Sequence, residues 1–166
     1  MQKEDTEKEF VKLISEFESL IHKVCRIYAY TVADRQDLFQ DVIVQLWKAF
    51  PKFKGEAKIS TWIYRVAINT AITQLRKKKD FITTYDPSDL QAHTDENHFL
   101  ETEDEQISQL YVAIEKLNQI EKAIVMLYME ERSYEEMEDI LGMSQGNLRV
   151  KMNRIKNKLR ELTKQI

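Results

Sequence analysis

Basic side chains gather on the last predicted helix of this 166-residue chain. The helix follows Ser144, a suitable N-cap, and carries one apolar stripe at intervals of four and three: Leu148, Met152, Ile155, Leu159 and Leu162. Around the stripe stand seven cations against a single acid, Glu161: Arg149, Lys151, Arg154, Lys156, Lys158, Arg160 and Lys164. Lysine and arginine neutralise phosphates, and arginine can also contact guanine at two places. The helix therefore has the chemistry of a DNA-binding element.

A short helix and a tight turn are expected to position this basic helix. Ser133 can cap the short helix, and Glu136 can complete a capping box. Gly142 can take the left-handed conformation that ends it, and Met143 then packs in the turn. The whole pattern predicts a helix-turn-helix, whose second helix can enter the major groove. Helical hairpins with a merely solvated basic face are also common, and the pattern alone leaves that alternative open.

A second set of candidate nucleic-acid contacts surrounds Gly55. Phe53, Lys54 and Lys58 stand in a loop, and Ser60 is expected to cap the helix that follows. That helix carries a polar stripe at three and four spacing: Thr61, Arg65, Asn69, Thr73 and Arg76. Cations can follow the phosphates of a single strand while aromatic rings stack on its bases. From spacing alone, a core aromatic and a solvated helix face are the simpler explanation.

Two amphipathic helices are predicted ahead of the loop. The first spans about residues 6–30, and the second begins near residues 33–36 and ends at Pro51. The second helix has a broad apolar face, and its outer face carries polar side chains: Asp37, Gln40, Asp41, Gln45 and Lys48. His22 and Cys25 lie near the stripe of the first helix, where we interpret them as packing residues, because two ligands do not make a metal site.

Composition and charge indicate the fold class and the division into domains. With only three glycines and two prolines, the chain is predicted to be all-α: two small helical domains, 1–79 and 105–166, joined by an acidic flexible linker, 80–104. Residues 80–115 hold ten acids and no base, whereas residues 1–79 and 116–166 carry net charges of +5 and +2. His93 and His98 are interpreted as scattered linker residues rather than metal ligands. A single cysteine, no apolar leader and no bilayer-length apolar run predict a cytoplasmic protein without membrane insertion.

Three motifs resemble one known family. Asp37-Leu38-Phe39-Gln40-Asp41-Val42, with Leu46-Trp47 behind it, is similar to the sigma-factor pattern Asp-Leu-Val-Gln-Glu-Thr-Phe…Ala-Trp. Residues 53–69, FKGEAKISTWIYRVAIN, are similar to Phe-Arg-Gly-Glu-Ser-x-Phe-x-Thr-Trp-Leu-Tyr-Arg-Ile-Ala-x-Asn. Residues 133–151 are similar to a Ser-Tyr-Glu-Glu-Ile helix followed by Leu-Gly-Ile-Ser-x-Gly-Thr-Val-Lys. In this order, the motifs resemble bacterial RNA polymerase sigma factors of the extracytoplasmic-function (ECF) type, in the sigma-70 family.

The resemblance implies that residues 1–79, as sigma region 2, bind core polymerase and the −10 promoter element. The family's clamp-binding positions correspond to Asp37, Gln40, Asp41 and Gln45. Its −10 contacts correspond to Phe53, Lys54, Trp62, Arg65 and Asn69. Phe53 and Asn69 are expected to line a pocket for an extruded base, with Ala49 and Val66 as walls. Trp62 fits a place in the core equally well.

Residues 105–166, as sigma region 4, are expected to bind the −35 element through positions that correspond to Gln145, Asn147, Arg149, Val150, Lys151, Asn153, Arg154 and Lys158. The family often has Ser in place of Val150, Thr in place of Asn147 and Pro in place of Asn118, so the promoter sequence stays open. The implied partners are the beta and beta-prime subunits of core polymerase, promoter DNA and, as a further candidate, an anti-sigma factor. We expect no enzymatic activity, no cofactor and no metal.

Two other classes compete with this interpretation. A plain helix-turn-helix regulator accounts for residues 105–166 but gives no reason for the pattern at residues 37–69. A nuclease needs acids or histidines clustered on ordered elements, whereas the acids here concentrate in the predicted linker.

Overall fold

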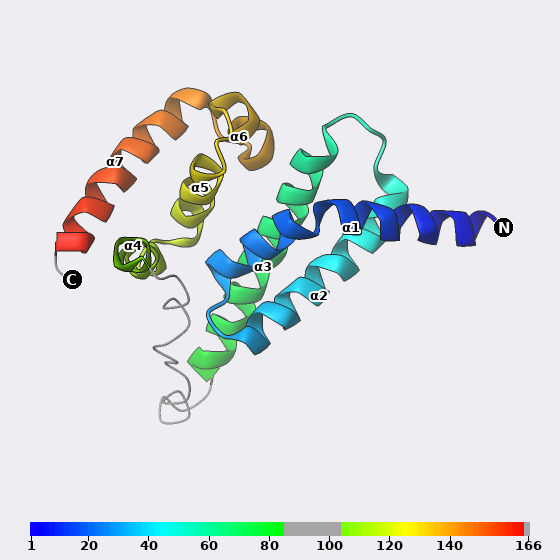
Figure 1. Cartoon of the computed structure of the whole chain (residues 1–166), viewed down its shortest axis with the longest axis horizontal. Coiled ribbons are helices and arrows are strands. Elements are labelled where there is room, and N and C mark those ends of the chain that lie inside the picture. The colour runs from blue at the N-terminus through cyan, green and yellow to red at the C-terminus, as the bar shows by residue number, and fades with distance from the viewer. Residues whose placement is uncertain (85–103, 165–166) are drawn as a thin grey trace.

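The computed structural model describes residues 1–84 and 104–164, and within these ranges every regular element is helical, which confirms the all-α prediction (Figure 1). The first group of elements comprises α1 (Gln2–Tyr28), α2 (Val32–Ala49), a short 3-10 turn η1 (Phe50–Lys52) and α3 (Ile59–Thr84). The second comprises α4 (Glu105–Glu115), α5 (Gln119–Met129), α6 (Tyr134–Leu141) and α7 (Gln145–Lys164). Helices α1, α2 and α3 pack on one another, while α7 packs on α4, α5 and α6.

Local caps fix the ends of the C-terminal helices. Asn118 and Glu121 form the predicted capping box of α5, each accepting a hydrogen bond from the backbone N–H of the other. The Ser133 hydroxyl accepts from Glu136 N at 3.1 Å, and the Ser144 hydroxyl accepts from Asn147 N at 3.2 Å. Gly142 has φ +70°, so it ends α6 in the left-handed conformation and confirms the predicted helix-turn-helix.

Three local predictions differ from the structure. Ser60 lies inside α3 rather than at its cap, because the helix begins at Ile59 and the Lys58 carbonyl accepts from Trp62 N. Helix α3 also continues to Thr84, past residue 79 where the sequence predicted its end. The Glu136 carboxylate pairs with Arg132 at 3.4 Å, and no reciprocal bond to Ser133 N is present. The rest of the predicted linker, with His93 and His98, lies outside the described residues.

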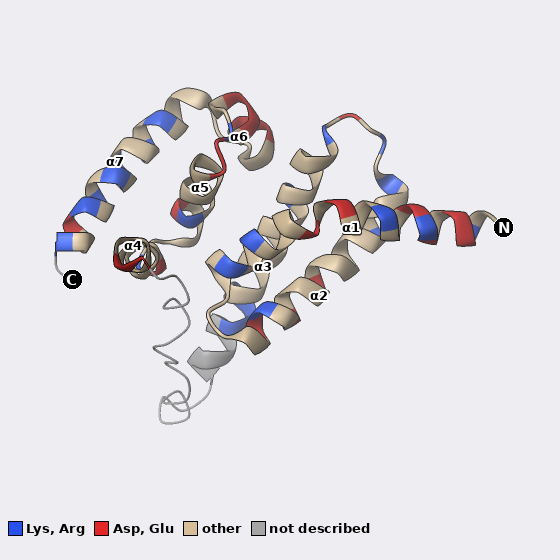
Figure 2. Ribbon diagram, in the orientation of Figure 1, with Lys and Arg blue, Asp and Glu red and all other residues tan. Residues whose placement is uncertain are grey.

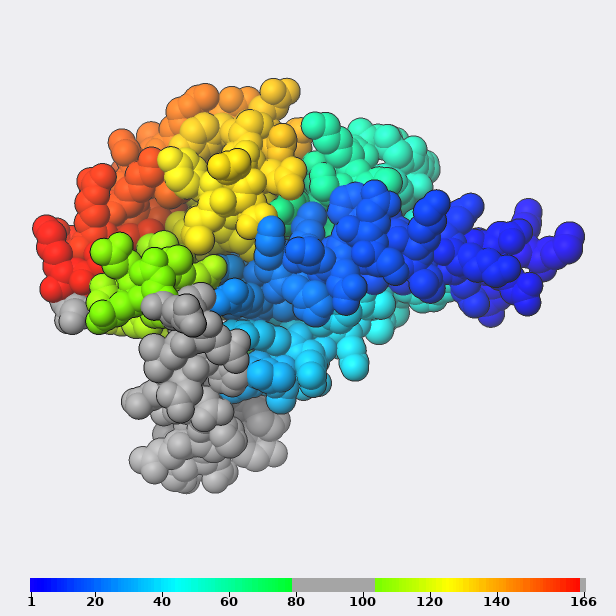
Figure 3. All heavy atoms as spheres, in the orientation of Figure 1, coloured from blue at the N-terminus to red at the C-terminus, as the bar shows by residue number. Residues whose placement is uncertain are grey.

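The buried side chains of the two helix groups form one continuous cluster. Ile21, Leu46 and Ile63 fill it in the N-terminal group, and Leu127 and Leu148 fill it in the C-terminal group. Helix α1 contacts α5, and α3 contacts α6. Figure 3 shows the yellow atoms of α5 directly against the blue atoms of α1. The two groups therefore pack together instead of standing apart.

Three further observations concern the single cysteine, membrane-spanning helices and metal sites. Cys25 is buried, and burial raises the pKa of its thiol to about 12. Among residues 1–84 and 104–164, no helix is long and apolar enough to cross a membrane. Those same ranges contain no group of three or more His, Cys, Asp or Glu placed to hold a metal ion.

Candidate nucleic-acid and polymerase interfaces

The four predicted clamp-binding residues all lie exposed on α2: Asp37, Gln40, Asp41 and Gln45. Their helix packs through the opposite face, where Leu38, Val42 and Leu46 are buried. The spacing of three and four residues thus separates a buried side from a polar outer side. In the described part of the chain, all four polar side chains therefore remain accessible to solvent.

Two of these α2 residues also border a hollow of about 550 Å³ between α2 and α3. Asp41 and Gln45 form one side of it, and Val66 and Asn69 form the other. Asn69 is exposed, so both the donor and the acceptor of its amide are available to a ligand. The hollow brings a predicted clamp-binding edge and a predicted −10 residue onto one continuous surface.

The loop before α3 builds a second hollow, of about 240 Å³. Phe53 and Trp62 stack in it with ring centroids 4.8 Å apart, and Lys54 and Arg65 also line it. Gly55 adopts φ +74°, a conformation that favours glycine and that reverses the loop beside these rings. An aromatic pair flanked by cations is suited to binding a stacked base and its phosphates.

Phe53 and Asn69 therefore line two adjoining hollows rather than the single pocket that the sequence led us to expect. Ala49 borders both hollows, whereas Val66 borders only the one with Asn69. Trp62 packs partly buried against the core, which agrees with the core placement, and its ring also stacks on Phe53.

The predicted polar stripe of α3 is not uniformly solvated. Thr61 is buried at 5% exposure, whereas Asn69, Thr73 and Arg76 are exposed. Arg65 is half-buried, and its Nε donates a hydrogen bond of 2.6 Å to the backbone oxygen of Asp139 in α6. The predicted −10 side chains thus differ sharply in how accessible they are.

Helix α7 packs through a buried stripe of Leu148, Met152 and Ile155, and the predicted −35 residues lie around this stripe. Exposed positions among them are Asn147, Arg149, Val150, Asn153, Arg154 and Lys158; Gln145 and Lys151 are partly buried. Figure 2 shows the blue basic residues spaced along this helix. The helix thus has a packing face and an exposed face on which most of the predicted −35 residues lie.

Two of the α7 cations lie over aromatic rings and a third forms an ion pair, and no pattern of residues in the sequence indicated these contacts. The Arg149 guanidinium lies over the Tyr134 ring at 5.0 Å, which fixes one predicted base reader against α6. Lys156 lies over the Tyr128 ring and also donates to its hydroxyl at 3.1 Å. Lys158 pairs with the Glu121 carboxylate at 3.1 Å, so this predicted phosphate contact is already engaged within the chain.

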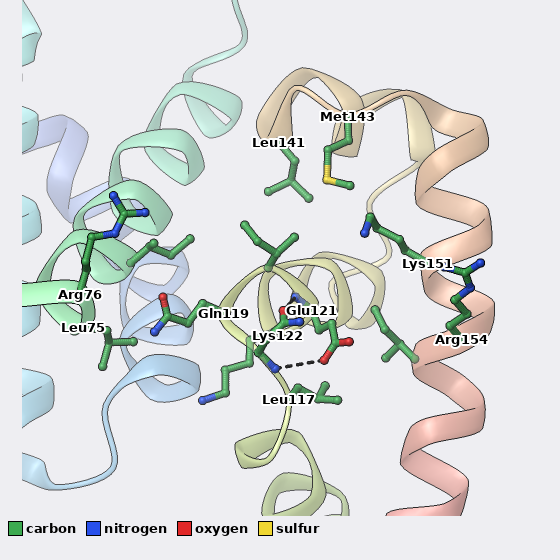
Figure 4. Close-up of a pocket in the computed structure, with 14 residues that line it drawn as sticks. Leu75, Arg76, Leu117, Gln119, Glu121, Lys122, Leu141, Met143, Lys151 and Arg154 are labelled. Atoms are coloured by element: carbon green, nitrogen blue, oxygen red, sulfur yellow. Dashed lines mark hydrogen bonds between the residues drawn. The ribbon is translucent and has the colours of Figure 1, made fainter. Parts of the chain in front are cut away.

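A groove of about 1050 Å³ separates α3 from α7, with α5 between them (Figure 4). Leu75 and Arg76 come from α3, and Lys151 and Arg154 come from α7 on the opposite side. Its lining combines apolar side chains, such as Leu117 and Ile155, with polar and charged ones, such as Gln119 and Lys122. Two predicted −35 residues thus face the N-terminal helices.

Models of one protein family match both helix groups. The sigma-70 region 2 family model matches residues 13–81, and the sigma-70 region 4 model matches residues 107–159. The chain is 28% identical to the ECF RNA polymerase sigma-E factor of Haemophilus influenzae, over 93% of this chain and 89% of that protein. It is 23% identical to the ECF RNA polymerase sigma factor SigW of Bacillus subtilis, over 92% of this chain and 87% of that protein.

A solved structure shares the fold as well. The sigma factor RpoE of Bartonella quintana, in complex with the anti-sigma factor NepR, superposes with a TM-score of 0.74 at 19% identity. The match covers 95% of this chain and 98% of that one. With both family regions matched in order and the relatives aligned along most of their length, the chain belongs to the sigma-70 family of RNA polymerase sigma factors, in its extracytoplasmic-function class.

Proposed function

We propose that this chain binds core RNA polymerase through α2 and directs it to promoters as an alternative sigma factor. Residues 1–79 serve as region 2, residues 80–104 as the connecting linker and residues 105–166 as region 4. The observation that carries the proposal is the hollow shared by Asp41 and Gln45 of α2 with Asn69 of α3. A promoter strand held there lies directly beside the surface offered to polymerase.

Region 2 is proposed to capture the −10 element as its strands separate. Extruding a base loses a few kcal/mol of stacking, which the site must return. The stacked Phe53 and Trp62 rings supply an aromatic surface, and the exposed Asn69 amide supplies hydrogen bonds to a base edge. Lys54 and Arg65 are proposed to bind the neighbouring phosphates.

Region 4 is proposed to place α7 in the major groove of the −35 element. Arg149, Asn153 and Arg154 suit base edges, and Val150, at 50% exposure, suits a thymine methyl. Gln145, Asn147, Lys151 and Lys158 are proposed to contact the backbone and set the register.

An anti-sigma factor is proposed as a third partner. RpoE of Bartonella quintana and CnrH, which superposes with a TM-score of 0.65 at 17% identity, were each solved with such a regulatory chain: NepR and the cytosolic domain of CnrY. The likeness supports the proposal through the shared fold alone.

Co-purification with bacterial core polymerase, followed by run-off transcription on fragmented genomic DNA, tests this function. We expect the chain to elute with core enzyme and to yield discrete transcripts that core alone does not produce. A plain helix-turn-helix regulator would bind DNA but would neither bind core nor start transcripts without another sigma factor. Failure of both binding and transcription would therefore refute the proposal.

A further inference from the structure

The two arginines that are proposed to read −35 bases stand in different surroundings on α7. The Arg149 guanidinium lies over the ring of Tyr134, with 5.0 Å between its central carbon and the ring centroid. Among residues 1–84 and 104–164, Arg154 has neither an ion pair nor an aromatic ring of this kind. Of the two, only Arg149 is therefore held by a neighbouring side chain before DNA arrives.

The Tyr134 ring is itself fixed by the fold. Tyr134 is the first residue of α6, directly after the Ser133 cap, and it packs half-buried against the hydrophobic core. Leu148, the chain neighbour of Arg149, is fully buried in the same core. Helices α6 and α7 pack on each other, and Figure 1 shows α6 beside the first turns of α7. The contact thus joins two side chains whose backbones are both anchored.

An aromatic ring supports an arginine without using its hydrogen bonds. The cation is attracted to the face of the ring, so the N–H donors of Arg149 stay free, and no residue in the described ranges forms an ion pair with it. A carboxylate would instead occupy such donors and place a negative charge beside the DNA phosphates, and Glu121 engages Lys158 in this way at 3.1 Å. Tyr134 can therefore orient Arg149 and leave its whole fork available for a base.

We propose that Tyr134 is a positioning residue for promoter reading: its ring holds the Arg149 guanidinium in the orientation in which it meets a −35 base. This inference rests on the proposed function, because it assumes that Arg149 faces the −35 element. Fixing a long side chain beforehand reduces the conformational entropy that is lost on binding. It also favours the bidentate contact with guanine, which needs a defined orientation of the fork. Tyr134 thus acts on specificity through Arg149 and touches no base itself.

Substitutions at Tyr134 separate the aromatic face from the bulk of the side chain. Tyr134→Leu keeps an apolar side chain against the core but removes the ring, whereas Tyr134→Phe keeps the ring and loses only the hydroxyl. Tyr128→Leu is the matched control: the Lys156 ammonium lies 4.6 Å from the centroid of the Tyr128 ring, but Lys156 is not among the predicted promoter contacts. Denaturant unfolding of each variant is measured first, and Tyr134→Met takes the place of Tyr134→Leu if the leucine variant does not fold.

The measured quantity is the affinity of holoenzyme for promoter duplexes that each carry one substituted base pair in the −35 element. The promoter is one found by run-off transcription, and fluorescence anisotropy gives the dissociation constants. Arg149→Ala first identifies the base pair that Arg149 reads, as the position at which this variant no longer discriminates. Discrimination at the other base pairs, including any that Arg154 reads, is the internal standard for each Tyr134 variant.

We expect Tyr134→Leu to lower discrimination at the Arg149 base pair about two- to fivefold, the range of an exposed cation–π contact. Discrimination at the other base pairs should be unchanged, and Tyr134→Phe and Tyr128→Leu should match the parental protein at every position. In the Arg149→Ala background, Tyr134→Leu should lower discrimination no further, because the two residues act as one unit.

Three results overturn the inference: Tyr134→Leu leaves the Arg149 base pair unaffected, it weakens all base pairs alike as a merely structural residue does, or its effect persists without Arg149. In each of these cases Arg149 keeps its own place as a reader, provided that Arg149→Ala has lost discrimination at one base pair. A panel that Arg149→Ala leaves unchanged overturns that proposed reader instead, and the role of Tyr134 falls with it.

Discussion

Arg65 and Asn69 stand one turn apart on α3 but meet different surroundings. Arg65 is bound to the Asp139 carbonyl, whereas the Asn69 amide is exposed beside the hollow between α2 and α3. A contact that acts on an extruded base exists only after the strands separate. We therefore expect the proposed role of Asn69 to affect promoter opening and not the first encounter with duplex DNA.

Asn69→Ala is expected to reduce promoter opening strongly while leaving closed-promoter binding nearly unchanged. The loss should approach the roughly 1–3 kcal/mol of a good base contact. Permanganate reactivity of unpaired thymines, measured per bound holoenzyme, reports the open fraction. Asn157→Ala removes an exposed amide on α7 and serves as the control. Equal thymine reactivity in the Asn69→Ala and parental complexes would remove Asn69 from the base site.

Arg154→Ala is expected to weaken −35 binding at one or two base positions by about 1–3 kcal/mol. Lys158→Ala should instead weaken binding evenly across sequences and lower the salt dependence. Affinities over a panel of −35 base substitutions distinguish the two patterns. Because Lys158 also pairs with Glu121, the thermal unfolding of the Lys158→Ala variant is measured in parallel. We expect its free energy of unfolding to fall by less than about 1 kcal/mol. Identical profiles for both variants across the panel would contradict the division into base reader and phosphate contact.

At the scale of elements, the turn between α6 and α7 depends on one backbone conformation. Gly142→Ala is expected to destabilise the protein by about 1–2 kcal/mol, since φ +70° strains any residue with a Cβ. No atom lies within 4 Å of the added methyl, so the loss comes from the backbone and not from a clash. Gly146→Ala is the matched control: it lies within α7 in equally open space and should stabilise by up to about 1 kcal/mol. Denaturant unfolding measures both, and a loss at position 146 as large as that at position 142 would refute the backbone explanation.

The sequence predicted these elements well wherever their ends depend on nearby residues. Asn118 with Glu121, Ser133 as an N-cap and Gly142 each act within four residues of the backbone group that they satisfy, and all three appear as expected, although Glu136 does not complete the box at Ser133. The predicted start of α3 is wrong by contrast. The helix already begins at Ile59, where the Lys58 carbonyl accepts from Trp62 N, and a good capping residue at position 60 does not exclude this earlier start. Helix α3 also ran beyond its triple lysine, since nothing in that stretch breaks a helix before Thr84.

At the scale of the whole molecule, sequence reasoning could not find the packing of one helix group on the other. Lys23 of α1 donates a hydrogen bond to Glu130, which follows α5, across 107 positions of the sequence. Neither residue belongs to a motif or to a regular stripe. The carbonyl that binds Arg65 leaves no trace in residue type at all, since every residue of the chain offers one. Motif matching identified which side chains could read DNA, but their accessibility is decided by contacts of this long-range kind.

The exposed α2 surface leads to a last prediction. Asp41→Ala is expected to weaken binding to core polymerase by at least about 1 kcal/mol, roughly fivefold, as for a contributing interface residue. The exposed acid Glu9 of α1 lies outside the predicted surface, and Glu9→Ala is the control, measured by fluorescence anisotropy with labelled core. The fold loss for Asp41→Ala should exceed that for Glu9→Ala, because only Asp41 lies among the predicted clamp-binding residues. Equal affinities of the parental protein and the Asp41→Ala variant for core polymerase would remove Asp41 from the proposed interface.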